Sequence, residues 1–444
     1  MASSLGATDK KWITAFGIDK RDFLPEVLDL NNEEYFTSLT DILEMSGRYT
    51  PAINPLFSHW ADDPVFQLLD TTGATVVGSG TATVTTALTA GSGKYARKTD
   101  LVKFPNNKVG YITNVVTSAG IDTLTITSVD GSVLTHTAGQ LLSIFSNAVG
   151  EASVAPVNRK FGLVQYTNKV QIIRDVNEET DVQMASQVEL EWNGSHYIID
   201  KELAQKALMF KAWINGTILG GEMSTTSHQD TSPTLIDPLN GRAVQTSRGL
   251  DQTIRSYGIV DTVATPGTFT YADMSDLISQ ILANKGTKNY LVLRGTKAAM
   301  IMDSYFKGIT SGISAGKLSL DARSFDMTVD KFTFGNHNFQ FGSMGIQDGD
   351  MFSQTDINRS IYYIPLDSVK TKGSGMLPRI SMKWMPHGVK AGNFGTDMVA
   401  EFDTGALARQ GATSEEMVRK THWITHQGLQ VLGARHFAKQ IVLA

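Results

Sequence analysis

Residues 195–221 read SHYIIDKELAQKALMFKAWINGTILGG and carry a long helical pattern. Apolar residues recur at steps of three and four, which places them on one face of a helix. Ser195 is suited to cap the start of this helix, and Gly220-Gly221 to end it. At 1.5 Å per residue the helix would measure roughly 40 Å, which is long for a globular domain. The apolar face consists of Ile199, Leu203, Ala207, Phe210, Ile214 and Ile218.

The composition of the whole chain narrows the class of protein. With 444 residues it can form two or three compact units, and its net charge of −5 argues against an electrostatic nucleic-acid binder. Cysteine is absent, which excludes disulfides, thiolate metal sites and cysteine nucleophiles. We find no apolar run long enough for a membrane span and no signal-peptide pattern, so we expect a soluble intracellular protein. The 40 glycines and only 19% charged residues indicate much strand and loop, and a surface less charged than that of a free monomer.

Residues 1–72 predict an extended, partly helical arm. Pro51, Pro55 and Pro64 interrupt regular structure there, although Phe57 and Trp60 are large and apolar. We expect these side chains to pack on the body of the protein or on a neighbour.

Residues 73–154 differ sharply in composition, because Thr, Val, Gly and Ser dominate. Asp130-Gly131 lies between two β-prone runs, which predicts a two-residue hairpin. We interpret the segment as a small inserted β-barrel or sandwich domain. Its predicted strands are residues 74–77, 101–104, 109–116, 124–129 and 141–145.

Residues 155–194 predict a long two-stranded arm with a charged tip. Apolar and polar residues alternate from 164 to 176 and again from 182 to 192, where the return is a strand or in part a helix. An isolated two-stranded ribbon is marginal in water, so this arm should gain its stability from what it lies on. We predict that a neighbouring subunit contacts its apolar face and faces its charged tip with basic residues. The candidate contact residues are Val164, Tyr166, Val170, Ile172, Arg174, Asp175, Glu178, Glu179 and Asp181.

The second half of the chain predicts a compact α/β unit followed by C-terminal strands. A mobile stretch at 223–249 precedes it. The predicted helices are 271–285 and 295–306, and the predicted strands are 289–294, 329–334, 339–341, 361–365, 381–385, 398–402, 421–427, 429–433 and 436–443.

The sequence contains partial matches to nucleotide-binding, metal-binding and catalytic motifs, but each lacks required features. Gly91-Ser92-Gly93-Lys94 lacks the earlier glycine and the following Ser or Thr of a phosphate loop. His422 and His426 are four apart, but their flanks predict a strand, in which they would lie ~13 Å apart. Lys372-Gly373-Ser374-Gly375 has lysine two residues before its serine, where a nucleophile elbow needs glycine. We therefore predict no catalytic residues, no cofactor and no metal site.

The order of these parts resembles the major capsid proteins of tailed bacteriophages, the HK97 fold. Residues 158–176 look like the segment entering the extended E-loop of that family, 201–208 like its spine helix and 423–438 like its closing strand pair. The phrase at 147–153 loosely matches a subgroup with a β-rich insertion before the E-loop. The resemblance, which covers residues 70–444, implies an α+β fold. Its parts would be an N-terminal arm (1–72), the inserted β-domain (73–154), the E-loop (155–194), the peripheral domain with the spine helix (195–255), the axial domain (256–380) and the return to the peripheral domain (381–444).

The resemblance implies a shell protein rather than an enzyme. Copies would assemble as hexamers and pentamers into the icosahedral head that encloses the DNA genome, in the virion and, during assembly, in the host cytoplasm. Scaffolding, portal and auxiliary capsid proteins would be further partners. DNA contact would be weak and non-specific, and no membrane would be involved. Alternatives are a β-rich phage attachment or decoration protein, an encapsulin-like compartment shell protein, and an α/β enzyme built on 256–370.

Two family features are not transferred to this chain. Some relatives bond an E-loop lysine covalently to a neighbour, but Lys169 lies low on the predicted arm and the tip is acidic. No long helical segment precedes the arm, so we expect an uncleaved N-terminus and a separate scaffold, if one is used.

Overall fold

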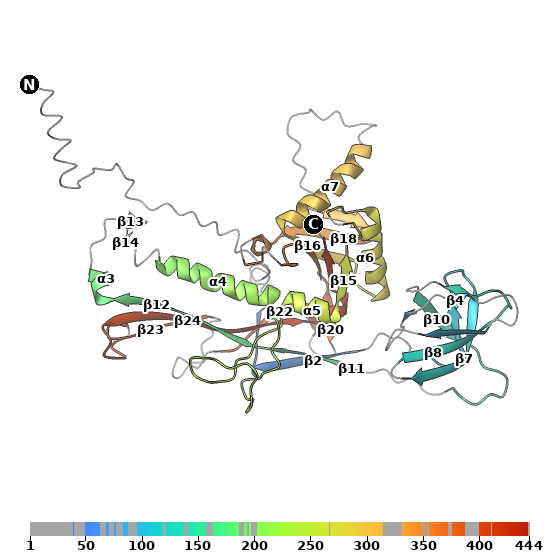
Figure 1. Ribbon diagram of the computed structural model, residues 1–444, viewed down its shortest axis with the longest axis horizontal. Helices are drawn as coiled ribbons and strands as arrows, with labels where there is room; N and C mark the ends of the chain where they lie inside the picture. Colours follow the sequence, from blue (N-terminus) through green and yellow to red (C-terminus); the bar gives the residue numbers. More distant parts are fainter. Residues whose placement is uncertain are drawn as a thin grey trace, which may run out of the picture. The chain divides into compact units, whose positions relative to one another are not determined.

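The computed structural model divides into two compact units, which we describe separately. The first comprises Met1–Phe57 and Asn168–Ala444, and the second Ser58–Thr167. Figure 1 shows the elements of both. The predicted helical part of the arm lies almost wholly outside the described residues. These are residues 39, 49–62, 68–70, 75–76, 83–87, 96–118, 121–136, 141–156, 163–185, 191–192, 195–196, 202–265, 267–313, 331–348, 351–352, 355–371, 375–386, 399–409 and 411–442.

The second unit is built on an antiparallel six-stranded sheet in the order β3-β10-β6-β7-β8-β5. Alternate residues of β7 and β8, among them Ile112, Leu124 and Ile126, point into a core that excludes water, which explains why these Thr-rich runs fold as strands. The unit extends beyond 73–154 at both ends. Its strands are β3 (Leu68–Asp70), β4 (Thr75–Val76), β5 (Thr83–Ala87), β6 (Asp100–Lys103), β7 (Val109–Ser118), β8 (Ile121–Ser128), β9 (Thr135–His136) and β10 (Leu141–Asn147).

The hairpin predicted at Asp130-Gly131 is wrong. Gly131 adopts a positive φ of 72°, and Asp130 Oδ1 accepts hydrogen bonds from Ser128 Oγ and Ser132 N, so the chain does turn there. The strand that follows, β9, pairs with β4 rather than with β8. The side chain of Asp130 thus closes a local turn, and the pairing partner comes from elsewhere in the chain.

A separate ribbon consists of β2 (Leu56–Asp62) and β11 (Leu163–Lys169), which pair only with each other among the described strands. His59 stacks on Tyr166 with ring centroids 5.3 Å apart. On β2 the alternate residues Leu56 and Trp60 are exposed.

The first unit contains a long sheet in the order β1-β22-β24-β12, with β23 also paired to β24. Its longest strand, β24 (Val418–Val431), pairs with β12 (Gln171–Thr180) over ten residues, from Gln171↔Gln427 to Thr180↔Val418. The remaining strands are β1 (Tyr49–Pro51), β22 (Ile380–Trp384) and β23 (Val399–Thr404).

Helix α4 (Glu202–Gly220) runs alongside β12 and β24 (Figure 1). It ends at Gly220 as predicted. It starts later than expected, because Ser195 lies in β14 (Ser195–His196), which pairs with β13 (Glu191–Trp192). The helix is therefore about 28 Å long rather than 40 Å. Phe210, Ile214 and Ile218 are buried as the stripe predicts, whereas Ala207 is exposed.

The α/β part of the first unit is a mixed six-stranded sheet in the order β15-β25-β19-β16-β18-β17. A capping box between Thr270 and Asp273 fixes the start of α6. The apolar face of this helix packs on the sheet through Met274 and Leu277. The elements are α5 (Leu250–Tyr257), β15 (Ile259–Thr262), α6 (Tyr271–Ala283), β16 (Asn289–Arg294), α7 (Thr296–Ile313), β17 (Lys331–Phe334), β18 (His337–Ser343), β19 (Ser360–Pro365) and β25 (Ala438–Ile441), with a β20 (Ser368–Thr371) and β21 (Gly375–Pro378) hairpin beside them.

Two further predictions fail in the C-terminal part. Residues 421–427 and 429–433 are not a strand pair, because Gly428 lies inside the continuous strand β24. The chain then turns at Gly433, which has a φ of 69°, and β25 enters the α/β sheet between β15 and β19. The last strand thus leaves the long sheet instead of returning to it.

The predicted two-stranded arm at 155–194 is also different. Its outgoing strand β12 is an integral part of the long sheet, and Asp181–Ala185 forms the short helix α3. Among the described strands, β2 and β11 form the two-stranded ribbon instead. Sequence alternation detected the strands, but it could not identify their partners, since pairing depends on residues more than a hundred positions away.

Candidate interaction site

The acidic residues of the predicted tip meet basic residues of the same chain. Glu179 forms an ion pair with Arg419, and Asn177 Nδ2 donates to Glu179 Oε1 over 3.0 Å. Glu178 lies 3.5 Å from Lys420 Nζ, which also binds Glu416 at 2.8 Å. Basic residues of the chain itself therefore face these two carboxylates, and a further contact of the tip with a neighbouring subunit stays a prediction. Asp181 is exposed at the start of α3.

Arg174 takes part in a chain of polar contacts across the same sheet. Its Nη2 lies 3.1 Å from His422 Nδ1, and His422 Nε2 lies 2.8 Å from Thr404 Oγ1. Burial lowers the pKa of His422, and the nearby Arg174 lowers it further. A neutral imidazole can accept from Arg174 and donate to Thr404 at once, so the geometry fits the uncharged ring. Asp175 Oδ1 accepts from Val176 N at 2.8 Å.

The apolar candidates divide among three environments. Val164 and Tyr166 lie on the β2–β11 ribbon, half-buried on the face of the His59 stack. Val170 is only 2% exposed and belongs to the core, so its prediction as a surface contact is wrong. Ile172 is exposed on β12. Sequence reasoning missed β2 as the partner of β11, although the alternation of Leu56–Asp62 carries the signal.

Lys169 acts as an internal clamp. Its Nζ is buried and donates to the backbone carbonyls of Ser224, Thr225 and Thr226 at 2.7–3.2 Å. Burial lowers the pKa of this ammonium group. Because three backbone acceptors surround its nitrogen, Lys169 serves to hold the segment after α4 in place.

The segment 223–249 is predicted to be mobile, but hydrogen bonds to Gln245 and Arg248 hold its C-terminal end. Asn168 Nδ2 donates to the carbonyls of Arg248 and Leu429, and Asn168 Oδ1 accepts from Arg248 N. Gln245 Nε2 donates to Val170 O at 2.7 Å. Side-chain amides thus replace the hydrogen bonds that regular structure would supply.

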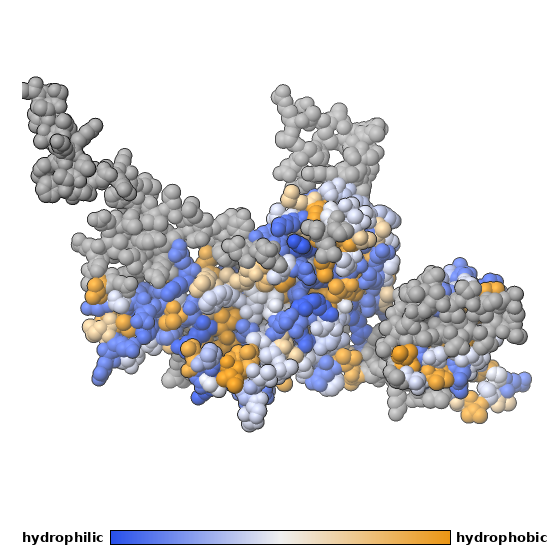
Figure 2. Space-filling view, in the orientation of Figure 1, coloured by the Kyte–Doolittle hydropathy of each residue, from blue (hydrophilic) through white to orange (hydrophobic). Residues whose placement is uncertain are grey.

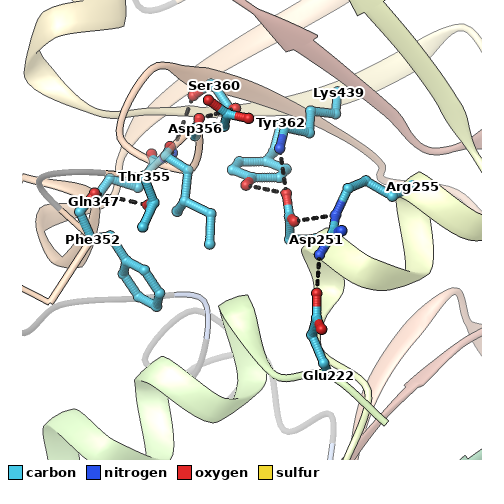
Figure 3. A network of polar contacts seen from close by, with 11 residues as sticks. Glu222, Asp251, Arg255, Gln347, Phe352, Thr355, Asp356, Ser360, Tyr362 and Lys439 are labelled. Atoms are coloured by element: carbon cyan, nitrogen blue, oxygen red, sulfur yellow. Dashed lines mark hydrogen bonds and ion pairs between the residues drawn. The ribbon is translucent and has the colours of Figure 1, made fainter.

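A buried ionic network joins α5 to the sheet of the α/β part (Figure 3). Asp251 Oδ1 accepts from Lys439 Nζ at 2.6 Å and from Tyr362 Oη at 2.8 Å, and Asp251 Oδ2 accepts from Arg255 Nε at 2.7 Å. Arg255 also binds Glu222, directly after α4. Burial raises the pKa of Asp251, but the attraction of Lys439 and the hydrogen bonds outweigh it and lower the pKa below its usual value. This network fixes the junction of α4, α5 and β25.

A hollow of about 560 Å³ lies between β12, the second half of α4 and Met351-Phe352. Gly216 and Gly220 make room for this segment, because the Phe352 ring lies 2.7 Å from the position that a Cβ on Gly220 would take. Ile172 and Arg174 of β12 and Trp213 of α4 also line the hollow.

The described residues contain no cluster of three or more His, Cys, Asp or Glu placed to hold a metal ion. Within the same part of the chain, no helix is long and apolar enough to cross a membrane. His422 and His426 lie along strand β24, as their flanks predict.

One comparison with known proteins identifies a family. The model of a family described as SU10 major capsid protein matches residues 12–344. No curated protein matches the sequence.

Solved structures with a similar course of the chain include phage and phage-like particles. They include a capsid of a native GTA particle computed with C5 symmetry (9% identity, 96% of this chain and 95% of that chain, TM-score 0.38). Gordonia phage Cozz matches with 9% identity over 96% of this chain and 91% of that chain, with a TM-score of 0.41. Microbacterium phage Oxtober96 matches with 8% identity over 96% and 97%, with a TM-score of 0.42. Because these TM-scores lie below 0.5, the family assignment rests on the sequence match to the family.

Proposed function

The chain belongs to the SU10 major capsid protein family and is a structural protein of the phage head shell, and we propose that its β2–β11 ribbon links neighbouring subunits within that shell. Hexamers and pentamers of the chain would form the icosahedral head around the DNA genome. The ribbon would then make the contact with a neighbouring subunit that is predicted for an arm at 155–194.

The observation that carries this proposal is the exposed apolar surface of the ribbon. Trp60 is 61% exposed, and Leu56 and Leu163 are exposed as well. A two-stranded ribbon is marginal by itself, and large exposed apolar patches mark interaction sites. In a protein that assembles with itself, a second copy is the simplest partner for this surface.

The other parts of the shell subunit are assigned by their order. We assign α4 and the long sheet to the peripheral domain, and the α/β sheet, including β25, to the axial domain. The second unit is assigned to the inserted β-domain, on the outside of the shell. The order of these elements along the chain, in which only β25 joins the α/β sheet after β24, supports the assignments.

Partners beyond the chain itself follow from charge and from the assembly route. A net charge of −5 releases few counterions on DNA, so contact with the packaged genome should be weak and non-specific. Scaffolding, portal and auxiliary capsid proteins complete the proposed set of partners.

The ribbon proposal is tested by Trp60→Ser, with Phe145→Ser as the matched control. Both aromatic side chains are exposed, so neither change should alter the melting of the protomer. We expect Trp60→Ser to weaken each ribbon contact about tenfold, which is 1.4 kcal/mol, and so to lower the yield of particles, and we expect Phe145→Ser to leave the yield unchanged. Electron microscopy and sedimentation of the expressed protein measure the yield. Normal particles from Trp60→Ser would refute the role of the ribbon.

A further inference from the structure

The tip of the loop after α4 exposes three aliphatic side chains close together. Leu239 is 93% exposed, and Leu235 and Ile236 are exposed as well. Figure 2 shows hydrophobic surface gathered over this loop, in the lower centre of the view. Burying a leucine is favourable, so a tip that keeps its leucines in water calls for a surface that covers them.

The tip is held in one shape. Val244 N donates to Leu235 O at 2.9 Å, Ile236 bridges Ala243, and Asp237 N donates to Arg242 O at 2.8 Å. Gly241 closes the turn with a φ of 69°. Together with the clamp at Lys169, these bonds make the tip a preformed knob, so docking it loses little conformational entropy.

A carboxylate accompanies the leucine at the tip. Asp237 Oδ1 accepts from Leu239 N at 2.9 Å, so the acidic group and the apolar side chain are presented together. A matching surface therefore needs an apolar depression with a cation beside it.

The hollow beside α4 has these properties. Ile172, Trp213 and Met351 are partly exposed around it, and Arg174 stands at its rim. A cavity of about 150 Å³ already holds a benzene-sized group, so about 560 Å³ has room for Leu239 and a neighbouring side chain.

We propose that the loop tip of one subunit, residues 235–239, seats in the hollow of a second copy, with Leu239 against Trp213 and Asp237 facing Arg174. The inference rests on the proposed shell function and names a second contact within it, independent of the ribbon. Because tip and hollow are different patches, the contact is head-to-tail, the type that closes rings. A second copy is the occupant because the chain itself carries both complementary surfaces.

The absence of cysteine from the chain allows a direct test. Leu239→Cys and Trp213→Cys are made as separate variants, assembled alone and together, oxidised, and run on non-reducing gels. We expect a disulfide-linked dimer only in the mixed particles. Ile172→Cys serves as a second acceptor in case Trp213→Cys fails to fold.

The outcomes separate this inference from the proposed function. Mixed particles without a dimer band, for both acceptors, overturn the tip-in-hollow contact and leave the shell function standing. A single chain carrying both cysteines that closes its disulfide within the monomer also overturns it. Failure of the unmodified chain to form particles with its assembly partners would refute the proposed function itself.

A charge at the tip provides an independent measurement. Leu239→Asp should weaken each contact about tenfold or more, which is 1.4 kcal/mol, and so lower the particle yield. Leu282→Asp, at an exposed leucine of α6, is the matched control and should leave the yield unchanged. Equal yields from the two variants would contradict the proposal.

Discussion

Ion pairs occur in two regions with different surroundings. One is the network around Asp251, and the other is the pair of strands β12 and β24, which we call the rim. Asp251 and Lys439 pair with side chains 5% and 2% exposed. On the rim the exposure changes between adjacent residues, since the side chain of Glu179 is 6% exposed and that of Glu178 is 52% exposed. Their partners, Arg419 and Lys420, are adjacent as well.

The difference shows that burial, and not the charge itself, decides what an ion pair contributes. A buried charge that loses its partner keeps its desolvation penalty, so breaking such a pair costs about 3–5 kcal/mol. An exposed pair is worth about 0–1 kcal/mol, because water screens both charges. The two regions should therefore respond very differently to similar substitutions.

The largest effect is expected from Lys439→Met. It leaves the buried carboxylate of Asp251 without its nearest cation, and the free energy of unfolding should fall by about 3–5 kcal/mol. Urea unfolding of the soluble protomer measures this change. The double variant Asp251→Leu with Lys439→Met removes both charges and should recover part of the loss. A loss below 1 kcal/mol in the single variant would show that Arg255 alone can hold Asp251.

The next effect concerns acid stability and His436, which lies between β24 and β25. Burial, together with Arg379 and Arg435, lowers the pKa of His436 from 6.5 to about 4. Below pH 6.5 His436 is protonated in the unfolded chain but stays neutral in the folded chain. The free energy of unfolding therefore falls as the pH drops from 6.5 to about 4. The full loss is about 3 kcal/mol at 1.36 kcal/mol per pKa unit.

The variant His436→Gln tests this pH dependence. Its unfolding free energy should change less between pH 7 and pH 4 than that of the unmodified chain, measured by urea unfolding at several pH values. His422→Gln is the corresponding variant in strand β24, because the pKa of His422 is also lowered. Identical pH profiles for His436→Gln and the unmodified chain would show that carboxylates alone govern acid unfolding.

Glu179→Gln should have an intermediate effect. Arg419 would lose its buried carboxylate partner, and the free energy of unfolding should decrease by about 1–3 kcal/mol. Thermal unfolding of the soluble protomer is a suitable measurement. Reversing the charge of both Glu178 and Glu179 should for the same reason destabilise the protomer. If both side chains were exposed at a free tip, the same change would leave its stability unaltered.

The smallest effect is expected one residue earlier. Glu178→Gln removes a partner that lies 3.5 Å from Lys420, which keeps its contact to Glu416 at 2.8 Å. The unfolding free energy should change by less than about 0.5 kcal/mol, and added salt should reduce the change further. If Glu178→Gln were as damaging as Glu179→Gln, exposure would not be the deciding variable on this rim.

Local pattern was enough to predict many elements of the fold. Strand β16 has the predicted bounds, Asn289–Arg294, and α6 begins at Tyr271 as expected. Both lie in a unit where helices and strands alternate along the chain, so each apolar face finds its partner nearby. The end of α4 at Gly220 likewise follows from the chemistry of a single residue.

The candidate contact residues were predicted less well, because their environment depends on distant segments. The alternation of 164–176 shows that this segment is a strand, but not that β24 covers part of it and β2 the rest. Val170 therefore lies in the core and Glu179 in a buried pair, although both fit the pattern of a free arm.

The sequence by itself determined the periods of the helices and strands, the absence of thiol chemistry and the order of parts that resembles a capsid protein. The tertiary structure alone decided which two strands form a separate ribbon, which ammonium group binds the segment after α4, and which ion pairs are buried. The reason is physical. Periodicity reflects interactions within about four residues, whereas strand pairing and desolvation depend on segments such as 171–180 and 418–427, which meet only in the folded chain.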